Sequence, residues 1–171
     1  SFHTVALIGR YNGRKSAVSV DALGGFLLQR GCRVLLEDAS AEATGIGRFE
    51  TADYSGIGQQ ADLAVVLGGD GSMLNAARNL ARFKVPLVGV NQGRLGFMTD
   101  ITAGSMLDAI GQVLDGDFSV EDRTLLSAEV VHDGKQVFST IALNDVVVNK
   151  GAVGRLIEFL VHIDDEFVYD L

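Results

Sequence analysis

Short apolar runs that alternate with helical patterns most strongly restrict the fold of this chain. Each run is of the kind found in buried parallel strands, and the segments between them show amphipathic or helical patterns. The runs lie at residues 5–9, 33–37, 63–67 and 86–90, and the helical segments at about 16–30, closed by Gly31, and 73–83. This alternation predicts an α/β domain with an open, mostly parallel sheet. Residues 39–58, rich in Ala, Gly, Ser and Thr, are expected to form a loop with one weak helical turn.

The pattern changes after about residue 100. One further helix is expected at 105–114, and strand-like segments then follow in succession at 125–131, 136–143, 146–149, 156–163 and from 167 to the end. Tight-turn signals at Asp133-Gly134 and at residues 164–166 make these strands hairpin neighbours. We therefore predict an α/β domain over residues 1–100, followed over 101–171 by the first, incomplete part of a β-rich antiparallel domain. The cleft between two such domains is the default ligand site.

Composition narrows the classes of function. The net charge is −8 and no run of Lys and Arg stands out, which argues against a nucleic-acid-binding surface. No apolar run approaches the roughly 20 residues of a membrane helix, and the N-terminus lacks a signal pattern, so we expect a cytoplasmic protein away from membranes. The single Cys32 fits a reducing compartment and a small buried role. The three histidines lack metal-ligand spacing, and we expect them in solvent.

The most informative motif is Gly68-Gly69-Asp70-Gly71-Ser72, between the apolar run 63–67 and a helical stretch. Glycines let a ligand approach the main chain, and the start of a helix favours phosphate. A carboxylate there would repel a bare phosphate, but it suits a metal ion or a hydroxyl group that is being phosphorylated. The alternative is a glycine-rich turn that only joins a strand to a helix.

Three other segments carry polar or glycine-rich patterns. Residues 9–16 end in Lys-Ser but lack the glycine spacing of a Walker A loop, and no GxGxxG dinucleotide fingerprint is present. Residues 91–97 hold two glycines around a Leu and offer Phe97 as a flat face to a base, or else form a turn with Leu95 and Phe97 in the core. Asn144-Asp145 interrupts two apolar runs. We expect this pair either to bind a base or ribose or to form a bulge or turn in which the side chains bond to their own backbone.

Together the motifs at 68–72, 91–97 and 142–145, in this order and spacing, closely resemble those of the bacterial NAD kinase family. The resemblance covers essentially the whole chain. It implies transfer of the ATP γ-phosphoryl group to the 2'-hydroxyl of the adenosine ribose of NAD, with a divalent cation such as Mg²⁺. It also implies an N-terminal α/β domain, a C-terminal β-rich domain with the site between them, and a dimer or tetramer.

The resemblance also implies roles for individual residues. Asp70 matches the catalytic carboxylate, a general base for the ribose hydroxyl, and Gly71 beside it lets the nucleotide close in. Asn144 and Asp145 match a pair that contacts NAD, although most members of the family have Glu at the second position. Arg155 matches a position near the bound nucleotide.

Two further positions match less specifically. Phe97 matches a residue on the adenine side, and Ser72 stands where many members of the family have Thr.

The family's next two motifs would begin just past Leu171. We therefore expect the parent enzyme to be active and this stretch by itself to be inactive. Two alternatives stay open: a lipid kinase of the diacylglycerol or sphingosine type, and a nucleotide-binding module without catalysis. The acidic charge counts against a membrane-facing lipid kinase.

Overall fold

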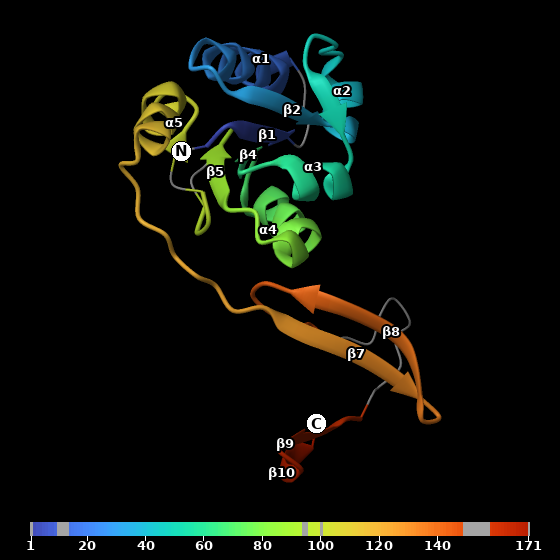
Figure 1. Cartoon of the computed structure of the whole chain (residues 1–171). Helices are drawn as coiled ribbons and strands as arrows, with labels where there is room; N and C mark the ends of the chain where they lie inside the picture. The colour runs from blue at the N-terminus through green and yellow to red at the C-terminus, as the bar shows by residue number, and fades with distance from the viewer. Residues whose placement is uncertain (1, 10–13, 94–95, 100, 149–157, 171) are drawn as a thin grey trace.

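The computed structural model describes residues 2–9, 14–93, 96–99, 101–148 and 158–170. Its main feature is a six-stranded sheet in the order β3-β2-β1-β4-β5-β6, with every neighbouring pair parallel (Figure 1). The strands are β1 (Thr4–Gly9), β2 (Arg33–Glu37), β3 (Glu50–Ala52), β4 (Leu63–Leu67), β5 (Leu87–Asn91) and β6 (Ile101–Thr102). The four predicted parallel strands are confirmed, and the sheet confirms the predicted α/β class.

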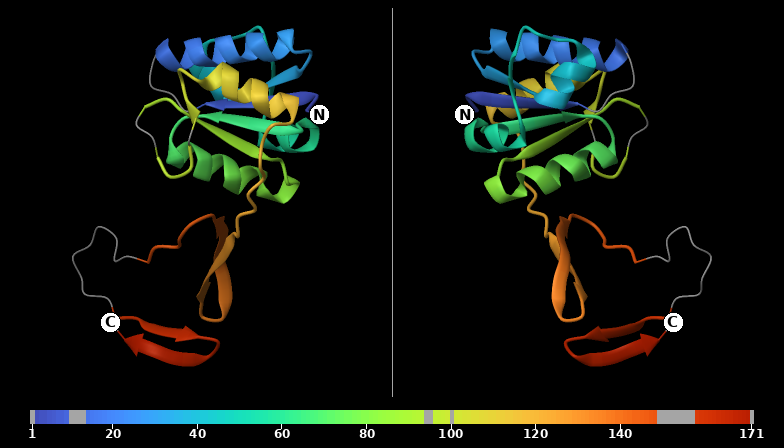
Figure 2. Two further views of the ribbon diagram at one scale, coloured as in Figure 1. Left: turned by 90° about the vertical axis from the view of Figure 1, so that its left-hand side faces the viewer. Right: turned by 90° about the vertical axis from the view of Figure 1, so that its right-hand side faces the viewer.

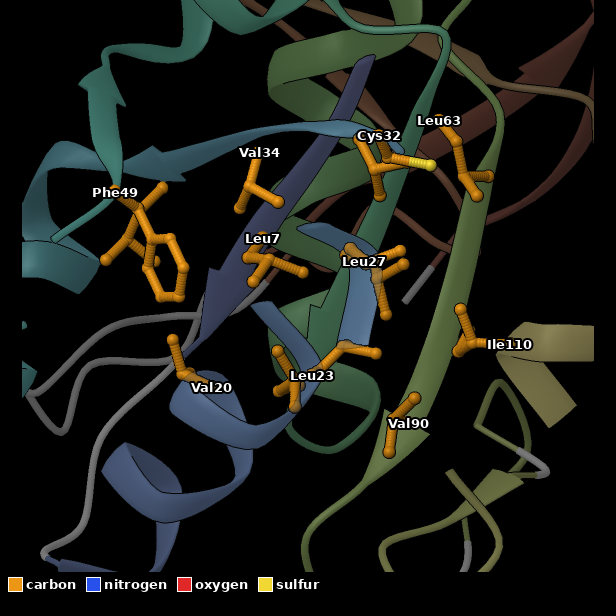
Figure 3. Close-up of a cluster of buried hydrophobic side chains, with 14 of the residues drawn as sticks. Leu7, Val20, Leu23, Leu27, Cys32, Val34, Phe49, Leu63, Val90 and Ile110 are labelled. Carbon is orange, nitrogen blue, oxygen red and sulfur yellow. The ribbon is translucent and has the colours of Figure 1, made fainter. Parts of the chain in front are cut away.

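Helices cover both faces of this sheet, as the side views in Figure 2 show. Five α-helices are described: α1 (Arg14–Gln29), α2 (Asp38–Thr44), α3 (Tyr54–Gln60), α4 (Asp70–Leu80) and α5 (Met106–Asp115), with a short 3₁₀ helix, η1 (Ala81–Phe83), after α4. Residues alternate between the two faces along each strand. Leu7 packs with α1 and α5 (Figure 3), whereas its neighbour Ile8 packs with α3 and α4.

The sequence prediction was wrong for residues 39–58, which form α2, β3 and most of α3 rather than a loop. Both helices are short, and side chains just before them satisfy their first backbone N–H groups. The Glu37 carboxylate accepts from the N–H groups of Ala39 and Ser40, and Asp53 accepts from that of Gly56. Such caps and the pairing of β3 with β2 lie outside what periodicity detects.

The predicted helices agree with the structure in position. The helix expected at 16–30 is α1, and Gly31 follows it with a positive φ of 80°, as a glycine C-cap does. The helix expected from residue 73 begins three residues earlier, at Asp70, so the glycine-rich motif lies across its first turn.

The boundary between domains was expected near residue 100. Beyond that residue, β6 extends the parallel sheet and α5 contributes Met106 and Ile110 to its core. We therefore propose that the N-terminal unit extends to Gly116, the left-handed cap of α5. Residues 117–125 then run without regular structure toward the first hairpin.

Two antiparallel hairpins form the rest of the described chain (Figure 1): β7 (Leu126–His132) with β8 (Lys135–Ala142), and β9 (Leu160–Ile163) with β10 (Glu166–Asp170). The predicted turns are confirmed, since Asp133 and Gly134 in the first and Asp164 and Asp165 in the second have positive φ. A strand at 146–149 was predicted wrongly: residues 146–148 have no regular structure, and residue 149 lies outside the described residues.

Among the described residues, the hairpins carry more exposed large apolar side chains than the N-terminal unit does. They include Leu126, Val130, Val131, Val137, Phe138, Leu160, Ile163, Phe167, Val168 and Tyr169. A strand pair with both faces in water has no core of its own. The sequence therefore predicted these strands from residue propensity, but it did not predict how they pack. Among the described helices, none combines the length and the apolar character needed to cross a bilayer.

Candidate functional site

The strand order places a switch point between β1 and β4. From β1 the chain moves outward to β2 and β3 on one side, and then returns to build β4, β5 and β6 on the other. In open α/β sheets, ligands bind in the crevice outside the carboxyl ends of the strands at such a point. Here Gly9 pairs with Leu67 at the ends of β1 and β4, directly before the glycine-rich motif.

The glycine-rich motif joins β4 to α4. The N–H of Gly68 bonds to the carbonyl of Val90, and Gly69 is the N-cap of α4 without a side-chain hydrogen bond to the helix. A Cβ at Gly68 would lie 2.7 Å from Cβ of the buried Ser72, whereas a Cβ at Gly69 or Gly71 would meet no atom of the described residues within 4 Å. None of these glycines has a positive φ. They therefore serve close packing at one position and open access to the main chain at the other two.

Asp70 ties the start of α4 to the loop after β5. Its Oδ2 accepts from the N–H of Phe97 at 2.9 Å, and its Oδ1 accepts from the N–H of Met98 at 3.0 Å. A Cβ on Gly96 would lie 2.6 Å from both Cγ and Oδ2 of Asp70, so only glycine allows this approach. An ionised carboxylate offers about four acceptor positions, and two backbone bonds leave room for a ligand hydroxyl or a metal ion.

Asn91 and Thr99 fix the two ends of that loop. Asn91 donates from Nδ2 to Thr99 Oγ1 at 2.8 Å, and its Oδ1 accepts from the N–H of Gly93 at 2.7 Å. Both side chains are buried. The sequence analysis did not assign this role to Asn91, although an Asn two residues before a glycine at the end of a strand is a typical local turn signal.

Phe97 projects from the same loop. Phe97 is 96% exposed, so the alternative that placed it in the core is wrong, while Leu95 lies outside the described residues. An exposed aromatic ring beside the Asp70 anchor remains available to a flat ligand.

A hollow of about 420 Å³ opens on the other side of the α4 N-terminus. Residues from β1, α2, α3 and α4 line it together with the last residue of β2; they are Ile8, Gly9, Glu37, Ala39, Tyr54, Ser72 and Asn75. Sequence reasoning missed Glu37, Tyr54 and Asn75. Glu37 ends a predicted strand, Tyr54 belongs to the segment that was expected to be a loop, and Asn75 lies inside a predicted helix. The ends of β1 and β2 and the start of α4 bring them together.

A buried polar network supports one wall of the hollow. The Glu37 side chain is only 8% exposed, and its Oε2 accepts from the N–H and the hydroxyl of Ser40, at 2.8 and 2.5 Å. Ser40 Oγ in turn accepts from the N–H of Gly9 at 3.2 Å. The network therefore connects the carboxyl ends of β1 and β2 and holds the Glu37 carboxylate against the hollow.

Tyr54 and Asn75 form the facing pair. Asn75 donates from Nδ2 to the Tyr54 hydroxyl at 3.0 Å. Burial raises the pKa of Tyr54, and the negative charge of Glu37 raises it further, while the bond from Asn75 lowers it. The Tyr54 hydroxyl therefore keeps its proton at neutral pH and can donate it.

Comparison with known proteins decides the family. The family model described as the ATP-NAD kinase N-terminal domain matches residues 5–118 of this chain. The chain belongs to the ATP-NAD kinase family. The end of that match, shortly after α5, also supports a first structural unit that extends beyond residue 100.

Individual relatives of the family agree. The chain is 53% identical over 170 residues to the NAD kinase of Aromatoleum aromaticum, covering 99% of this chain and 57% of the relative. It is 48% identical over 168 residues to the NAD kinase of Thiobacillus denitrificans, covering 98% and 58%. The chain thus spans somewhat more than half the length of these curated relatives.

A solved structure shows the same fold. Yeast NADH kinase, crystallised with NADH, superposes with a TM-score of 0.82 at 20% identity, over 98% of this chain and 54% of the yeast chain. This similarity supports the α/β architecture and the hairpins that follow it.

The structure separates the residues that the NAD kinase resemblance singled out. Asp70, Gly71 and Phe97 lie together around the start of α4. Asn144 and Asp145 are exposed in and just after the bend that follows β8, so the premise of polar residues inside a buried strand is wrong. β8 itself contacts α4, and Figure 1 shows its arrowhead below that helix.

The outcomes for the other predicted residues are brief. Arg155 lies outside the described residues. The three histidines are exposed, and Cys32 is buried, as the sequence predicted. Burial raises the pKa of the Cys32 thiol, which disfavours a reactive thiolate.

Proposed function

We propose that the full-length protein containing this chain is an NAD kinase, which transfers the γ-phosphoryl group of ATP to the 2'-hydroxyl of the adenosine ribose of NAD. Membership of the family supports the reaction. The observation that carries the proposal within the fold is Asp70: a carboxylate at the N-terminus of α4, fixed by two backbone bonds beside open glycine backbone.

The geometry suits phosphoryl transfer, in which positioning and charge stabilisation do most of the work. The first N–H groups of α4 and the positive end of its dipole attract phosphate oxygens, and the exposed backbone at Gly69 and Gly71 lets them approach. Asp70 accepts the proton of the ribose hydroxyl as the new P–O bond forms and the bond to the leaving diphosphate breaks. The loop N–H groups fix the direction of its carboxylate.

A divalent cation fits this donor set. Within the described residues, no three His, Cys, Asp or Glu side chains gather to hold a metal by themselves. Mg²⁺ is usually held by one or two carboxylates together with substrate phosphates, so Asp70 is the protein ligand we propose for it. When bound, the cation neutralises charge on the phosphates.

The remaining assignments follow the family resemblance. We propose that Asn144, Asp145 and Arg155 contact NAD from the β-rich part of the enzyme, with Phe97 on the adenine side. The contact between β8 and α4 supports the first two, because it brings the end of β8 toward the motif. We also propose a cytoplasmic dimer or tetramer that binds neither nucleic acid nor membranes.

Replacing Asp70 by Asn in the full-length enzyme tests the proposed base. Turnover should fall by about 100-fold or more, the scale of general base catalysis, while the Kd for NAD changes far less. Asp62→Asn is the matched control, since Asp62 also accepts two backbone N–H bonds, from His3 and Thr4, but lies directly before β4, at the opposite end of that strand from Asp70. Its turnover should match that of the wild type.

The same measurements separate the alternatives. An Asp70→Asn enzyme with unaltered turnover would contradict the proposed base. Wild-type protein that binds NAD without forming NADP would indicate a non-catalytic nucleotide-binding module. Phosphorylation of diacylglycerol or a sphingoid base in place of NAD would indicate a lipid kinase.

A further inference from the structure

Of the residues that the resemblance singles out, Ser72 is the one that lines the described part of the hollow between β2, α3 and α4. Its volume of about 420 Å³ lies within the roughly 300–1,000 Å³ of small-molecule sites. It also lies beside the switch point between β1 and β4, because Ile8 and Gly9 end β1 and Ser72 follows β4. Both its size and its place therefore suit a ligand of the α/β sheet.

The wall of the hollow matches a group with hydroxyl donors. Among the described residues, three donors occupy the roughly four acceptor positions of the Glu37 carboxylate, and the bond that its Oε1 accepts, from the Ala39 N–H, is long at 3.2 Å. Tyr54 accepts from Asn75 and keeps its own proton to donate. In dinucleotide-binding folds with this strand order, an acidic residue beyond the first βα unit accepts from a ribose hydroxyl.

Charge fixes the direction of such a ligand. The Glu37 carboxylate repels phosphate groups, whereas the N-terminus of α4, on which Ser72 lies, attracts them. A nucleotide would therefore place its ribose toward Glu37 and Tyr54 and its phosphates toward the glycine-rich motif.

The position of Asp70 distinguishes the side of α4 that faces the phosphate acceptor from the side that faces the phosphate donor. The Asp70 carboxylate faces the loop that follows β5, while the lining of the hollow comes from the β1, β2 and α3 side of α4. In-line transfer needs the attacking and leaving oxygens on opposite sides of the transferred group. The hollow therefore lies on the leaving-group side.

We propose that this hollow binds the nucleoside of the phosphate donor, with Glu37 and Tyr54 bonding its ribose hydroxyls and Asn75 orienting Tyr54. The inference rests on the proposed kinase function and extends it to the class of donor. An inorganic polyphosphate has no nucleoside to fill the hollow, so the enzyme should favour a nucleoside triphosphate.

The test uses Tyr54→Phe in the full-length enzyme, a change that removes one hydroxyl and keeps the ring packed against the core. We expect the KM for ATP to rise about 3- to 10-fold, with kcat and the KM for NAD unchanged. Glu37→Gln should raise the KM for ATP further, because a charged acceptor is lost. Ser55→Ala is the control: Ser55 neighbours Tyr54 on α3, but its hydroxyl bonds to Gln59 at the surface.

Calorimetric titration of ATP, tripolyphosphate and NAD into the same four proteins provides the second readout. Tyr54→Phe should weaken ATP binding and leave tripolyphosphate binding unchanged. A loss of NAD affinity alone, equal losses for ATP and tripolyphosphate, or no change for ATP would each overturn the inference. These titrations remain decisive if the wild type forms no NADP, which would refute the kinase function but not a nucleoside site.

Discussion

Gly96 lets the loop after β5 come close to the Asp70 carboxylate, which makes Gly96→Ala a sharp perturbation. The new Cβ would lie 2.6 Å from Cγ and Oδ2 of Asp70. Non-bonded carbon atoms prefer separations of about 3.5–4.0 Å, so the carboxylate or the loop must move by roughly 1 Å. Either movement stretches the bonds of 2.9 and 3.0 Å from the N–H groups of Phe97 and Met98 beyond hydrogen-bonding distance.

The cost follows from these two effects. Forced overpacking destabilises a protein by about 1–3 kcal/mol, and a hydrogen bond to a charged group contributes about 1.5–3 kcal/mol. A catalytic group displaced by about 1 Å can cost roughly 100-fold in rate. We therefore expect Gly96→Ala to lose about 2–3 kcal/mol of stability and about 100-fold in kcat/KM.

The assay is NADP formation from ATP and NAD by the full-length enzyme, together with urea unfolding. Gly93→Ala is the matched control in the same loop, because among the described residues its Cβ would meet Asn91 Oδ1 alone, at 3.9 Å. It should stay near wild type in both measurements. If Gly96→Ala keeps kcat/KM within twofold of the Gly93→Ala enzyme, the Asp70 anchor is not part of the catalytic geometry.

Two further predictions concern the scaffold. In α1, Gly24→Ala should destabilise by about 1–3 kcal/mol in urea unfolding, because its Cβ would lie 2.7 Å from Cε2 of the Phe49 ring and closer still to Cζ. Gly25→Ala places its Cβ 3.2 Å from Nη2 of Arg48, which bonds to Asp21 but lies at the surface and can shift by a few tenths of an ångström, so it should gain up to about 1 kcal/mol from helix propensity. Equal effects of the two substitutions would contradict this. Hydrogen bonds from two backbone N–H groups lower the pKa of Asp62. The stability that Asp62 contributes is therefore fully present above the unfolded pKa of about 3.9 and is lost as the pH falls through the lower folded pKa. Asp62→Asn should flatten the decline of the unfolding free energy below about pH 4, and an unchanged pH profile of stability would refute this reasoning.

The sequence predicted the buried parts of the fold because periodicity reports burial. β1, β2, β4 and β5 are apolar runs of five or six residues, and α1 and α5 each place apolar residues in the core. The segment 39–58 defeated the same reasoning, since its helices have seven residues each and start at side-chain caps rather than at an apolar stripe. Short elements of this kind are decided by local hydrogen bonds and tertiary pairing.

The candidate site was predicted unevenly for a related reason. Asp70 was identified because a carboxylate among glycines is unusual, and Gly96 because two glycines in one loop suggested a close approach. Glu37 and Tyr54 gave no comparable signal, since each is an ordinary residue in its own segment and becomes informative only when β2 and α3 are placed beside α4. Composition and spacing along the chain do not encode that proximity.

The lengths of the edge strands affect how readily the protein self-associates at high concentration. The six-stranded sheet ends in β3 and β6, of three and two residues, and short edges offer little backbone to another molecule. β7 and β8 have seven and eight residues, pair only with each other among the described strands, and carry exposed valines. A version that stops after α5 should therefore stay monodisperse at concentrations where the 171-residue chain self-associates through its hairpin edges.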